Sequence, residues 1–203
     1  MNPNLVSLEG KVAIVTGAGV GMGAATARLL AARGAKVIVS DINPDTAAAT
    51  VAAIRADGGT AHAVRTDVAD EAQVEALVAE TVATFGRLDC AVNNAAITPD
   101  VLPIHEADMA VFDKVLNVDL RSVMLCMKYE IRQILAQGSQ GSIVNIGSVS
   151  SFRPQPHNAA YVAAKHGVIG LTKTGSLEYA GKGIRVNAVL SSTALPKPTS
   201  PPR

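Results

Sequence analysis

The chain has 203 residues, of which 48% are hydrophobic and 17% are charged, so its length suits one domain with a substantial core. Its formal net charge of +1 excludes the basic stripe of a nucleic-acid-binding protein and the polybasic patch of a membrane-surface protein. Its two cysteines, Cys90 and Cys126, lie in apolar runs, and its four histidines lack metal-ligand spacing, so no disulfide framework or metal site is indicated. The expected partners are therefore small molecules or further copies of the chain.

The first ten residues lack the pattern of a secretory signal, and no apolar run is long enough to span a membrane. We therefore expect a cytoplasmic protein that does not enter a membrane.

Short apolar runs alternate with longer segments of helical pattern. Strands are expected over residues 11–16, 36–40, 61–66, 88–93, 142–146 and 184–189. Each run is apolar or β-branched on both faces, which is typical of a parallel sheet covered by helices on both sides. The pattern predicts an α/β fold, a three-layer, Rossmann-type doubly wound parallel sheet with right-handed crossovers.

The expected helices have recognisable ends. Asn43 can cap a helix that ends at the glycine pair 58–59, and Asp70 can cap another that ends before Gly86. The later helices are expected over about residues 108–137 and 158–180.

The regular pattern stops after Val189. Four of the chain's ten prolines lie in the last 14 residues (203 − 189), a composition that does not readily form a helix or a central strand. We expect one domain over residues 1–189 and a Pro/Ser-rich, disordered tail over residues 190–203.

A glycine-rich turn, Thr16-Gly17-Ala18-Gly19-Val20-Gly21-Met22-Gly23, follows the first expected strand and opens the first helix. Such a turn lets the backbone approach a pyrophosphate, and the helix N-terminus offers unpaired N–H groups with a positive dipole end. The glycine pattern alone is a weak signal, because a merely tight turn has the same composition.

Asp41 strengthens the nucleotide-binding interpretation. It ends the second strand 24 residues after Gly17 (41 − 17), where its carboxylate can accept hydrogen bonds from two ribose hydroxyls. A carboxylate at that place repels a 2′-phosphate, and neither Val20 nor Ile42 supplies a cation, so NAD is favoured over NADP. Asp67, after the third strand, can meet the adenine amino group or can simply cap its own loop.

A second group of polar residues lies later in the chain. Tyr161 and Lys165 are four residues apart on an expected helix, and a neighbouring ammonium lowers the pKa of a phenol, which makes it a general acid or base. Ser148 lies 13 residues earlier (161 − 148), where its hydroxyl can hold a carbonyl oxygen against the tyrosine. Asn117 can support a water chain to Lys165, although alone it is typical of a helix face.

In order and spacing these motifs resemble those of the short-chain dehydrogenase/reductase family. The resemblance covers about residues 8–189 and rests on Thr16-Gly17-x-x-x-Gly21-x-Gly23, Asn93-Asn94-Ala95, Asn117, Ser148 and Tyr161-x-x-x-Lys165. It implies that Tyr161 is the acid/base, Ser148 the substrate orienter, Lys165 a ribose ligand that tunes the tyrosine, and Asn117 a support of the proton relay. It also implies a homo-oligomer, commonly a tetramer built partly through the long helices, or a dimer.

The sequence departs from the family pattern in two places. Ala96 replaces the glycine that usually completes the Asn-Asn-Ala-Gly run. After Val189 the family pattern continues with a Pro-Gly turn, a substrate-covering segment, a helix and a last strand, and residues 190–203 match none of these. We therefore expect a truncated or altered C-terminus without the last strand and the lid helix.

The sequence predicts an NAD-dependent enzyme that transfers a hydride between NAD(H) and a secondary alcohol or ketone. The alternative is a catalytically impaired remnant that binds the cofactor or forms oligomers. Sugars, steroids, acyl thioesters and small ketones remain possible substrates, because loops or missing segments decide among them. The expected catalytic residues are Asn117, Ser148, Tyr161 and Lys165, and the expected cofactor-binding residues are Gly17, Gly19, Val20, Gly21, Met22, Gly23, Asp41, Asp67, Val68, Asn94, Ala95, Tyr161 and Lys165.

Overall fold

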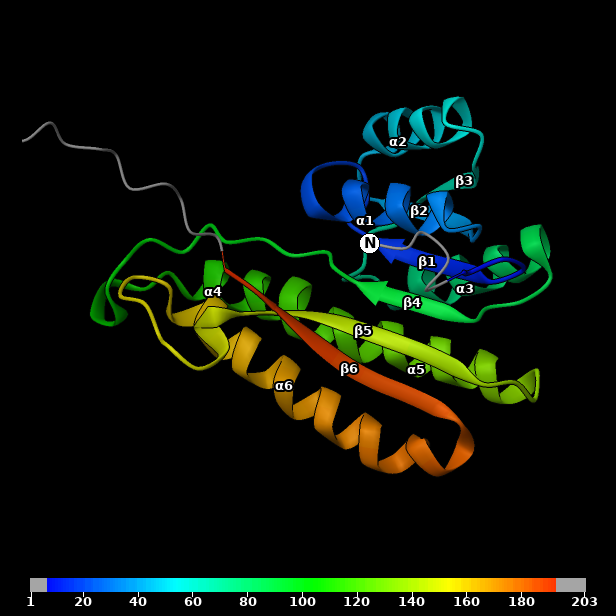
Figure 1. Ribbon diagram of the computed structural model, residues 1–203. Helices are drawn as coiled ribbons and strands as arrows, with labels where there is room; N and C mark the ends of the chain where they lie inside the picture. The colour runs from blue at the N-terminus through cyan, green and yellow to red at the C-terminus, as the bar shows by residue number, and fades with distance from the viewer. Residues whose placement is uncertain (1–6, 193–203) are drawn as a thin grey trace, which may run out of the picture.

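Six parallel strands in the order β3-β2-β1-β4-β5-β6 form the sheet of the computed structural model, which describes residues 7–192 (Figure 1). The strands are β1 (Val12–Thr16), β2 (Lys36–Asp41), β3 (Thr60–Arg65), β4 (Cys90–Asn93), β5 (Gly141–Ser148) and β6 (Ile184–Ser191). All six expected strands are present. The strand order reverses between β1 and β4, and open parallel sheets bind ligands at the carboxyl ends of their strands beside such a point.

Helices connect successive strands as expected. They are α1 (Gly21–Ala32), α2 (Pro44–Ala56), α3 (Glu71–Phe85), α4 (Met109–Leu116), α5 (Ser122–Ala136) and α6 (Ala159–Tyr179). The Asn43 side chain accepts from the N–H groups of the first turn of α2, and Asp70 does the same for α3. Gly86 ends α3 in the left-handed conformation with a φ of 84°. The capping residues identified in the sequence are thus confirmed.

The expected long helix over residues 108–137 is interrupted. Between α4 and α5, residues Asn117–Arg121 form a π-helical stretch, η2. Short π-helical stretches inside helices frequently occur at functional sites. Within η2 the Asp119 side chain is fully buried, whereas Asn117 is exposed.

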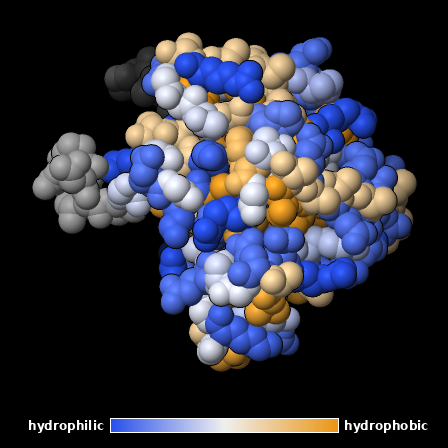
Figure 2. Space-filling model, turned by 90° about the vertical axis from the view of Figure 1, so that its right-hand side faces the viewer, coloured by the Kyte–Doolittle hydropathy of each residue, from blue (hydrophilic) through white to orange (hydrophobic). Residues whose placement is uncertain are grey.

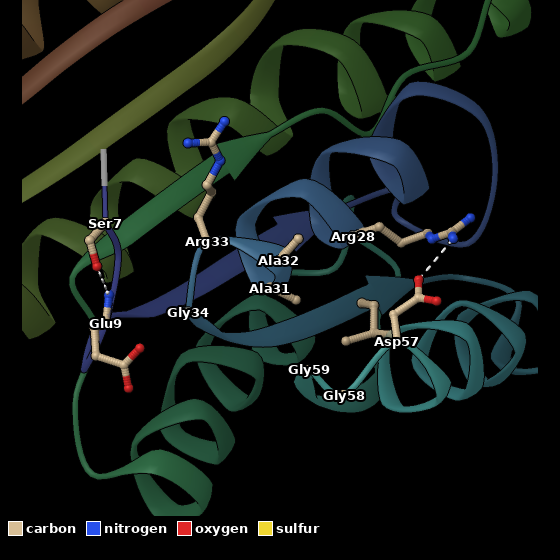
Figure 3. A pocket seen from close by; sticks show the side chains of 11 residues that line it. Ser7, Glu9, Arg28, Ala31, Ala32, Arg33, Gly34, Asp57, Gly58 and Gly59 are labelled. Carbon is tan, nitrogen blue, oxygen red and sulfur yellow. Dashed lines mark hydrogen bonds and ion pairs between the residues drawn. The ribbon is translucent and has the colours of Figure 1, made fainter. Parts of the chain in front are cut away.

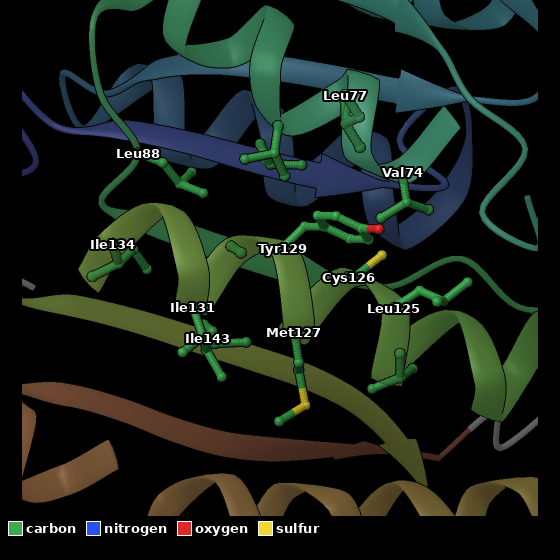
Figure 4. Close-up of a cluster of buried hydrophobic side chains, with 14 of the residues drawn as sticks. Val74, Leu77, Leu88, Leu125, Cys126, Met127, Tyr129, Ile131, Ile134 and Ile143 are labelled. Atoms are coloured by element: carbon green, nitrogen blue, oxygen red, sulfur yellow. The ribbon is translucent and has the colours of Figure 1, made fainter. Parts of the chain in front are cut away.

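The helices lie in two layers around the sheet (Figure 1). Buried alanines of α1 and α2 pack with valines of β1 and β2 on one face. On the other face, α3, α5 and α6 cover larger side chains. Figure 4 shows part of this second cluster, in which Val74 and Leu77 of α3 lie near Cys126 and Tyr129 of α5. The three-layer doubly wound fold is therefore confirmed.

The sheet ends at β6 within the described residues. β6 pairs with β5 over its whole length, from Gly141 opposite Ile184 to Ser148 opposite Ser191, and its other edge faces no described strand. The expected absence of a further strand and lid helix thus holds over residues 7–192. β6 includes Leu190 and Ser191, which the sequence assigned to the tail, and residues 193–203 of that tail lie outside the described residues.

Candidate functional site

The glycine-rich turn joins the carboxyl end of β1 to the first residue of α1. Gly17 and Gly21 have φ values of 61° and 58°, a left-handed conformation that favours glycine. A Cβ on Gly23 would lie 2.1 Å from the Gly17 carbonyl oxygen, so this close approach needs a bare backbone. Val20 precedes α1 without a side-chain cap, which leaves the first N–H groups of the helix for an anionic ligand.

Asn94 fixes the shape of this turn. Its side-chain amide donates to the carbonyl oxygens of Thr16 and Gly17 at 2.9 and 3.0 Å. In return the Thr16 hydroxyl oxygen accepts from the backbone N–H groups of Asn94 and Ala95 at 3.0 and 3.2 Å. The end of β4 is thus tied to the end of β1, and the turn is held before any ligand binds.

Asp41 lies directly beside the turn. Its Oδ2 accepts from the Gly19 N–H at 2.8 Å, and its Oδ1 accepts from the Asn43 N–H at 3.0 Å. A Cβ on Gly19 would lie 2.2 Å from the Thr46 hydroxyl oxygen, so glycine is required where the turn passes the end of β2. Each carboxylate oxygen retains acceptor capacity that a ligand diol can use.

A cavity of about 760 Å³ extends from the turn along the carboxyl ends of the strands. Its volume falls within the ordinary range of ligand pockets, about 300–1,000 Å³. Of the expected cofactor-binding residues, it is lined by Gly17, Val20, Asp41, Asp67, Val68, Asn94 and Ala95. Gly19, Gly21 and Gly23 shape the turn, and Met22 is exposed on the first turn of α1.

The structure also brings Ser148, Tyr161 and Lys165 together at this edge of the sheet. Ser148 is the last residue of β5, and its hydroxyl is hydrogen-bonded to the Tyr161 side chain. The Lys165 ammonium donates to the Ile146 carbonyl oxygen at 3.2 Å and lies 5.5 Å from the centroid of the Tyr161 ring. The Ser151 hydroxyl donates to the Lys165 carbonyl oxygen at 2.8 Å, which ties the end of β5 to α6.

The electrostatics of Tyr161 differ from the expectation. Burial raises the pKa of the phenol above its ordinary value, the hydrogen bond from Ser148 opposes this rise, and the charges of Asp119 and Asp100 add to it. Burial also lowers the pKa of Lys165, although Asp119 opposes that change. The chain's own side chains therefore do not produce the lowered phenol pKa that the Tyr-x-x-x-Lys spacing suggested, because burial and the charges of Asp119 and Asp100 outweigh the hydrogen bond from Ser148.

Asn117 and Lys165, which the sequence paired, do not meet among the described contacts. Asn117 is exposed and lines the 760 Å³ cavity. Asp119, two residues later, has its Oδ2 atom 3.5 Å from the Lys165 ammonium. Sequence reasoning missed Asp119, although one signal was present. Val115, Asp119 and Val123 follow one another at intervals of four, which places the acid on the buried face of the helical segment.

Asp100 is a second residue that the sequence did not single out. Its Oδ2 atom accepts a hydrogen bond from the Tyr161 backbone N–H at 3.2 Å. Asn158 precedes α6 but provides no side-chain cap, so Asp100 caps this helix from the segment between β4 and α4. The two residues are 61 positions apart, and no local pattern links them. The cap fixes the first turn of α6, which carries the phenol.

A separate cavity of about 540 Å³ is lined by the segments that precede β1, β2 and β3, and Figure 3 shows its lining residues. Its lining includes Glu9, Gly34 and the ion pair of Arg28 with Asp57, whose N–O distance is 2.9 Å. Hydrophilic and apolar residues are interspersed over the face of the molecule that Figure 2 shows. None of the expected site residues lines this cavity, so the carboxyl edge of the sheet is the candidate site.

Residues 7–192 contain neither a candidate membrane span nor a candidate metal-binding cluster. No helix there is both long and apolar enough to cross a membrane. No group of three His, Cys, Asp or Glu side chains there is arranged to hold a metal ion.

The family model described as short chain dehydrogenase matches residues 11–197. The chain is 46% identical over 183 residues to the 2,5-dichloro-2,5-cyclohexadiene-1,4-diol dehydrogenase of Sphingobium indicum, which covers 90% of this chain and 72% of that protein. It is also 46% identical over 179 residues to the cyclohexanol dehydrogenase of an Acinetobacter species, which covers 88% of this chain and 71% of that protein.

A crystal structure of a short chain dehydrogenase from Mycobacterium smegmatis superposes on this chain with a TM-score of 0.88 at 38% identity. The match covers 91% of this chain and 78% of the other. These proteins are thus longer than the segment that they share with this chain.

Proposed function

Because the chain belongs to the short chain dehydrogenase family, we propose that it is an NAD-dependent oxidoreductase that transfers a hydride between NAD(H) and a secondary alcohol or ketone. The observation that carries this proposal is the convergence of Ser148, Tyr161 and Lys165 beside the glycine-rich turn. One group of side chains suits proton transfer, and the adjacent cavity suits a dinucleotide. Neither half alone would specify an oxidoreductase.

The residues of the cavity fit a dinucleotide cofactor. The bare backbone of the turn and the uncapped start of α1 suit the pyrophosphate. Asp41 suits an adenosine ribose, and Tyr161 and Lys165 suit the nicotinamide end. We propose NAD rather than NADP, because a 2′-phosphate would lie against the Asp41 carboxylate. The cofactor's chemistry is hydride acceptance and donation, which no protein side chain supplies.

The chain's own residues handle the proton and the orientation of the substrate. The Ser148 hydroxyl is placed to donate a hydrogen bond to the substrate oxygen, because it already meets the Tyr161 side chain at the end of β5. In alcohol oxidation the Tyr161 Oη atom accepts the hydroxyl proton, and in ketone reduction it returns one to the carbonyl oxygen. The Lys165 ammonium supplies positive charge beside the phenol and is held by the Ile146 carbonyl oxygen. We keep Asn117 in a supporting role at the cavity wall.

We further propose that the substrate alcohol lies on a six-membered carbon ring. Both relatives described above are named for such substrates, a cyclohexadiene diol and cyclohexanol. Exposed apolar side chains on the segments that follow β4 and β5 favour a carbocycle over a sugar. Val101, Ile104 and Phe152, from the segments that follow β4 and β5, are 70%, 81% and 61% exposed. A ring that packs against such side chains removes apolar surface from water.

The experiment combines purified protein with NAD and a series of secondary alcohols, and measures formation of the reduced nicotinamide by its absorbance. Ring alcohols are expected to turn over faster than open-chain alcohols of equal carbon number, with sugars as the polar control. Equal rates for rings and open chains would contradict the ring proposal alone.

The alternative function is a remnant that binds the cofactor without turnover. Measurements of NAD binding and of turnover on the same purified protein distinguish the two. Thermal stabilisation by NAD with no reduced nicotinamide from any alcohol would support the remnant. A protein that NAD does not stabilise would overturn both proposals.

We also propose that the chain forms a dimer or tetramer through its long helices. A groove of about 850 Å³ lies between α4, η2, α5 and α6, and its lining includes Leu120, Met124, Gly167, Gly170 and Leu171. Small residues let helices approach closely, and Met124 is 50% exposed although it is apolar. The light-scattering mass of Met124→Glu is expected to fall relative to the unchanged protein. The cytoplasm remains the proposed compartment, because Cys90 and Cys126 are both free thiols.

A further inference from the structure

Asp119 is a fully buried acid whose two carboxylate oxygens have different surroundings. Its Oδ1 atom accepts from the Ile97 backbone N–H at 2.8 Å, which fixes the side chain relative to the segment after β4. Its Oδ2 atom has no hydrogen-bond partner among the described residues, and its neighbour is the Lys165 ammonium at 3.5 Å. The side chains of Asp119 and Lys165 are 0% and 3% exposed. A buried acid in this position needs a charge partner, and Lys165 is that partner.

The Lys165 ammonium contacts groups of two separate elements. The Ile146 carbonyl oxygen of β5 accepts from it at 3.2 Å, and the Asp119 carboxylate of η2 lies 3.5 Å from it. Loss of either contact would let the long lysine side chain adopt other rotamers. Asp119 therefore contributes to the position of the ammonium as well as to its charge.

The charged and titratable groups that interact with Asp119 come from two directions. Lys165 and Tyr161 lie on α6, and Asp100 lies on the segment that precedes α4. Burial raises the pKa of Asp119 to about 6, Lys165 opposes the rise, and Asp100 adds to it. The negative charge of Asp119 in turn raises the pKa of Tyr161. The phenol thus faces an ammonium whose field is offset by a carboxylate.

We propose that Asp119 is a positioning residue for the proton transfer at Tyr161, because its carboxylate anchors the Lys165 ammonium and offsets its field at the phenol. The inference rests on the proposed function for its chemical purpose, but the electrostatic coupling exists with or without turnover. In Asp119→Asn the amide keeps an acceptor for the Ile97 N–H but carries no charge. With the Asp119 charge removed, Asp100 is the one carboxylate among the described residues that still raises the pKa of Tyr161, and Tyr161 ionises at lower pH.

The chain offers a direct measurement of this coupling. It has three tyrosines and no tryptophan, so tyrosinate absorbance can be followed during an alkaline titration without interference. The contribution of Tyr161 is the difference between each protein and the same protein with Tyr161→Phe. Circular dichroism at each pH confines the comparison to folded protein. Asp119→Asn is expected to increase the acid dissociation constant of Tyr161 by about tenfold.

Two further variants make the result specific. Glu178→Gln removes one negative charge from an exposed position on the same helix as Tyr161, and it is expected to leave the titration of Tyr161 unchanged. In a Lys165→Met background, Asp119→Asn is expected to lose its anchoring effect, so the two substitutions will not be additive. Where Asp119→Asn fails to fold, Asp119→Ser replaces it in the same comparison, since serine is neutral and still offers an acceptor.

An unchanged or decreased acid dissociation constant of Tyr161 in the folded neutral variants would overturn the inference. An increase of the same size in Glu178→Gln would also overturn it, because the effect would then be one of net charge alone. The titration uses no substrate. An absence of turnover would therefore overturn the proposed function while leaving the test of Asp119 intact.

A kinetic readout complements the titration. The rise of kcat/KM for alcohol oxidation with pH is expected to move to lower pH in Asp119→Asn, whereas a purely structural loss would lower kcat/KM at every pH without moving its midpoint.

Discussion

The carboxylate of Asp41 accepts a hydrogen bond from the backbone N–H of Gly19 at 2.8 Å, so the end of β2 and the glycine-rich turn form one rigid unit. A ligand that uses the turn for its phosphates must therefore pass the carboxylate. This contact fixes the position of the Asp41 carboxylate, which we propose discriminates between NAD and NADP, relative to the backbone of the glycine-rich turn, which suits a pyrophosphate.

Substitution of Asp41 is expected to reduce the preference for NAD over NADP. Asp41→Ala removes both the repulsion of a 2′-phosphate and the acceptors for a ribose diol, so the ratio of NAD to NADP affinity should fall by about ten- to a hundredfold. Isothermal titration with each nucleotide measures the ratio. Asp45→Ala, at an exposed position in the first turn of α2, is the control that should keep it. An unchanged ratio in Asp41→Ala would remove the ribose argument.

Gly23→Ala is expected to weaken nucleotide binding more than it weakens the fold. The added Cβ would lie 2.1 Å from the Gly17 carbonyl oxygen and 2.6 Å from the Asn94 side-chain nitrogen, so the turn must shift. NAD-induced thermal stabilisation should fall accordingly. Gly181→Ala is the matched control, because nothing lies within 4 Å of its added Cβ. Full NAD stabilisation in Gly23→Ala would contradict the assignment of the turn to the cofactor.

Removal of the phenol oxygen should separate proton transfer from binding. Tyr161→Phe keeps the ring but loses the Oη atom that meets Ser148, so turnover should fall by about 10²- to 10⁴-fold. The affinity for NAD, measured by titration calorimetry, should change little. Wild-type rates in Tyr161→Phe would show that another group transfers the proton.

Glu130 should make the stability of the protein depend on pH. Its carboxyl is 1% exposed, and burial raises its pKa from 4.5 to about 7, while a hydrogen bond from the Asn93 amide opposes the rise. The folded state thus binds a proton that the unfolded state has lost between about pH 4.5 and 7. The contribution of Glu130 to stability is present below the lower pKa and is lost as pH rises through the upper one.

Glu130→Gln lacks this titration. At pH 8 the variant should be more stable than the unchanged protein by about 3 kcal/mol, and the difference should shrink towards pH 4.5. Urea unfolding at both pH values measures it. Glu75→Gln, exposed on α3, should have no such pH-dependent effect. If Glu130→Gln were no more stable than the unchanged protein at pH 8, ionisation of the buried Glu130 would not destabilise the fold, and the prediction would be wrong.

Much of the fold follows from local patterns in the sequence. Apolar runs predicted each of the six strands, because buried parallel strands need apolar residues on both faces. Asn43 and Asp70 identified helix starts because their short side chains satisfy N–H groups two or three residues later. The glycine-rich turn could also be predicted locally, because a positive φ or a close backbone approach calls for glycine at a single position.

The site was less predictable where contacts are distant in sequence. Asp100 caps α6 from 61 residues away, and no helical or strand period connects the two positions. Asn117 was chosen from the family motif, but it lies off the buried face that Val115, Asp119 and Val123 form at intervals of four. Asp119 therefore meets Lys165 in its place. The roles of Asn117, Ser148, Tyr161 and Lys165 stay predictions until the variants are measured.

The edge of β6 that faces no described strand is open to further pairing. Among residues 7–192 this strand hydrogen-bonds to β5 alone, and Val189 near its end is 52% exposed. An exposed strand edge with apolar neighbours can pair with an extended peptide or with the same edge of a second copy of the chain. Within residues 7–192 this edge is therefore a place at which an extended peptide could join the sheet as a further strand.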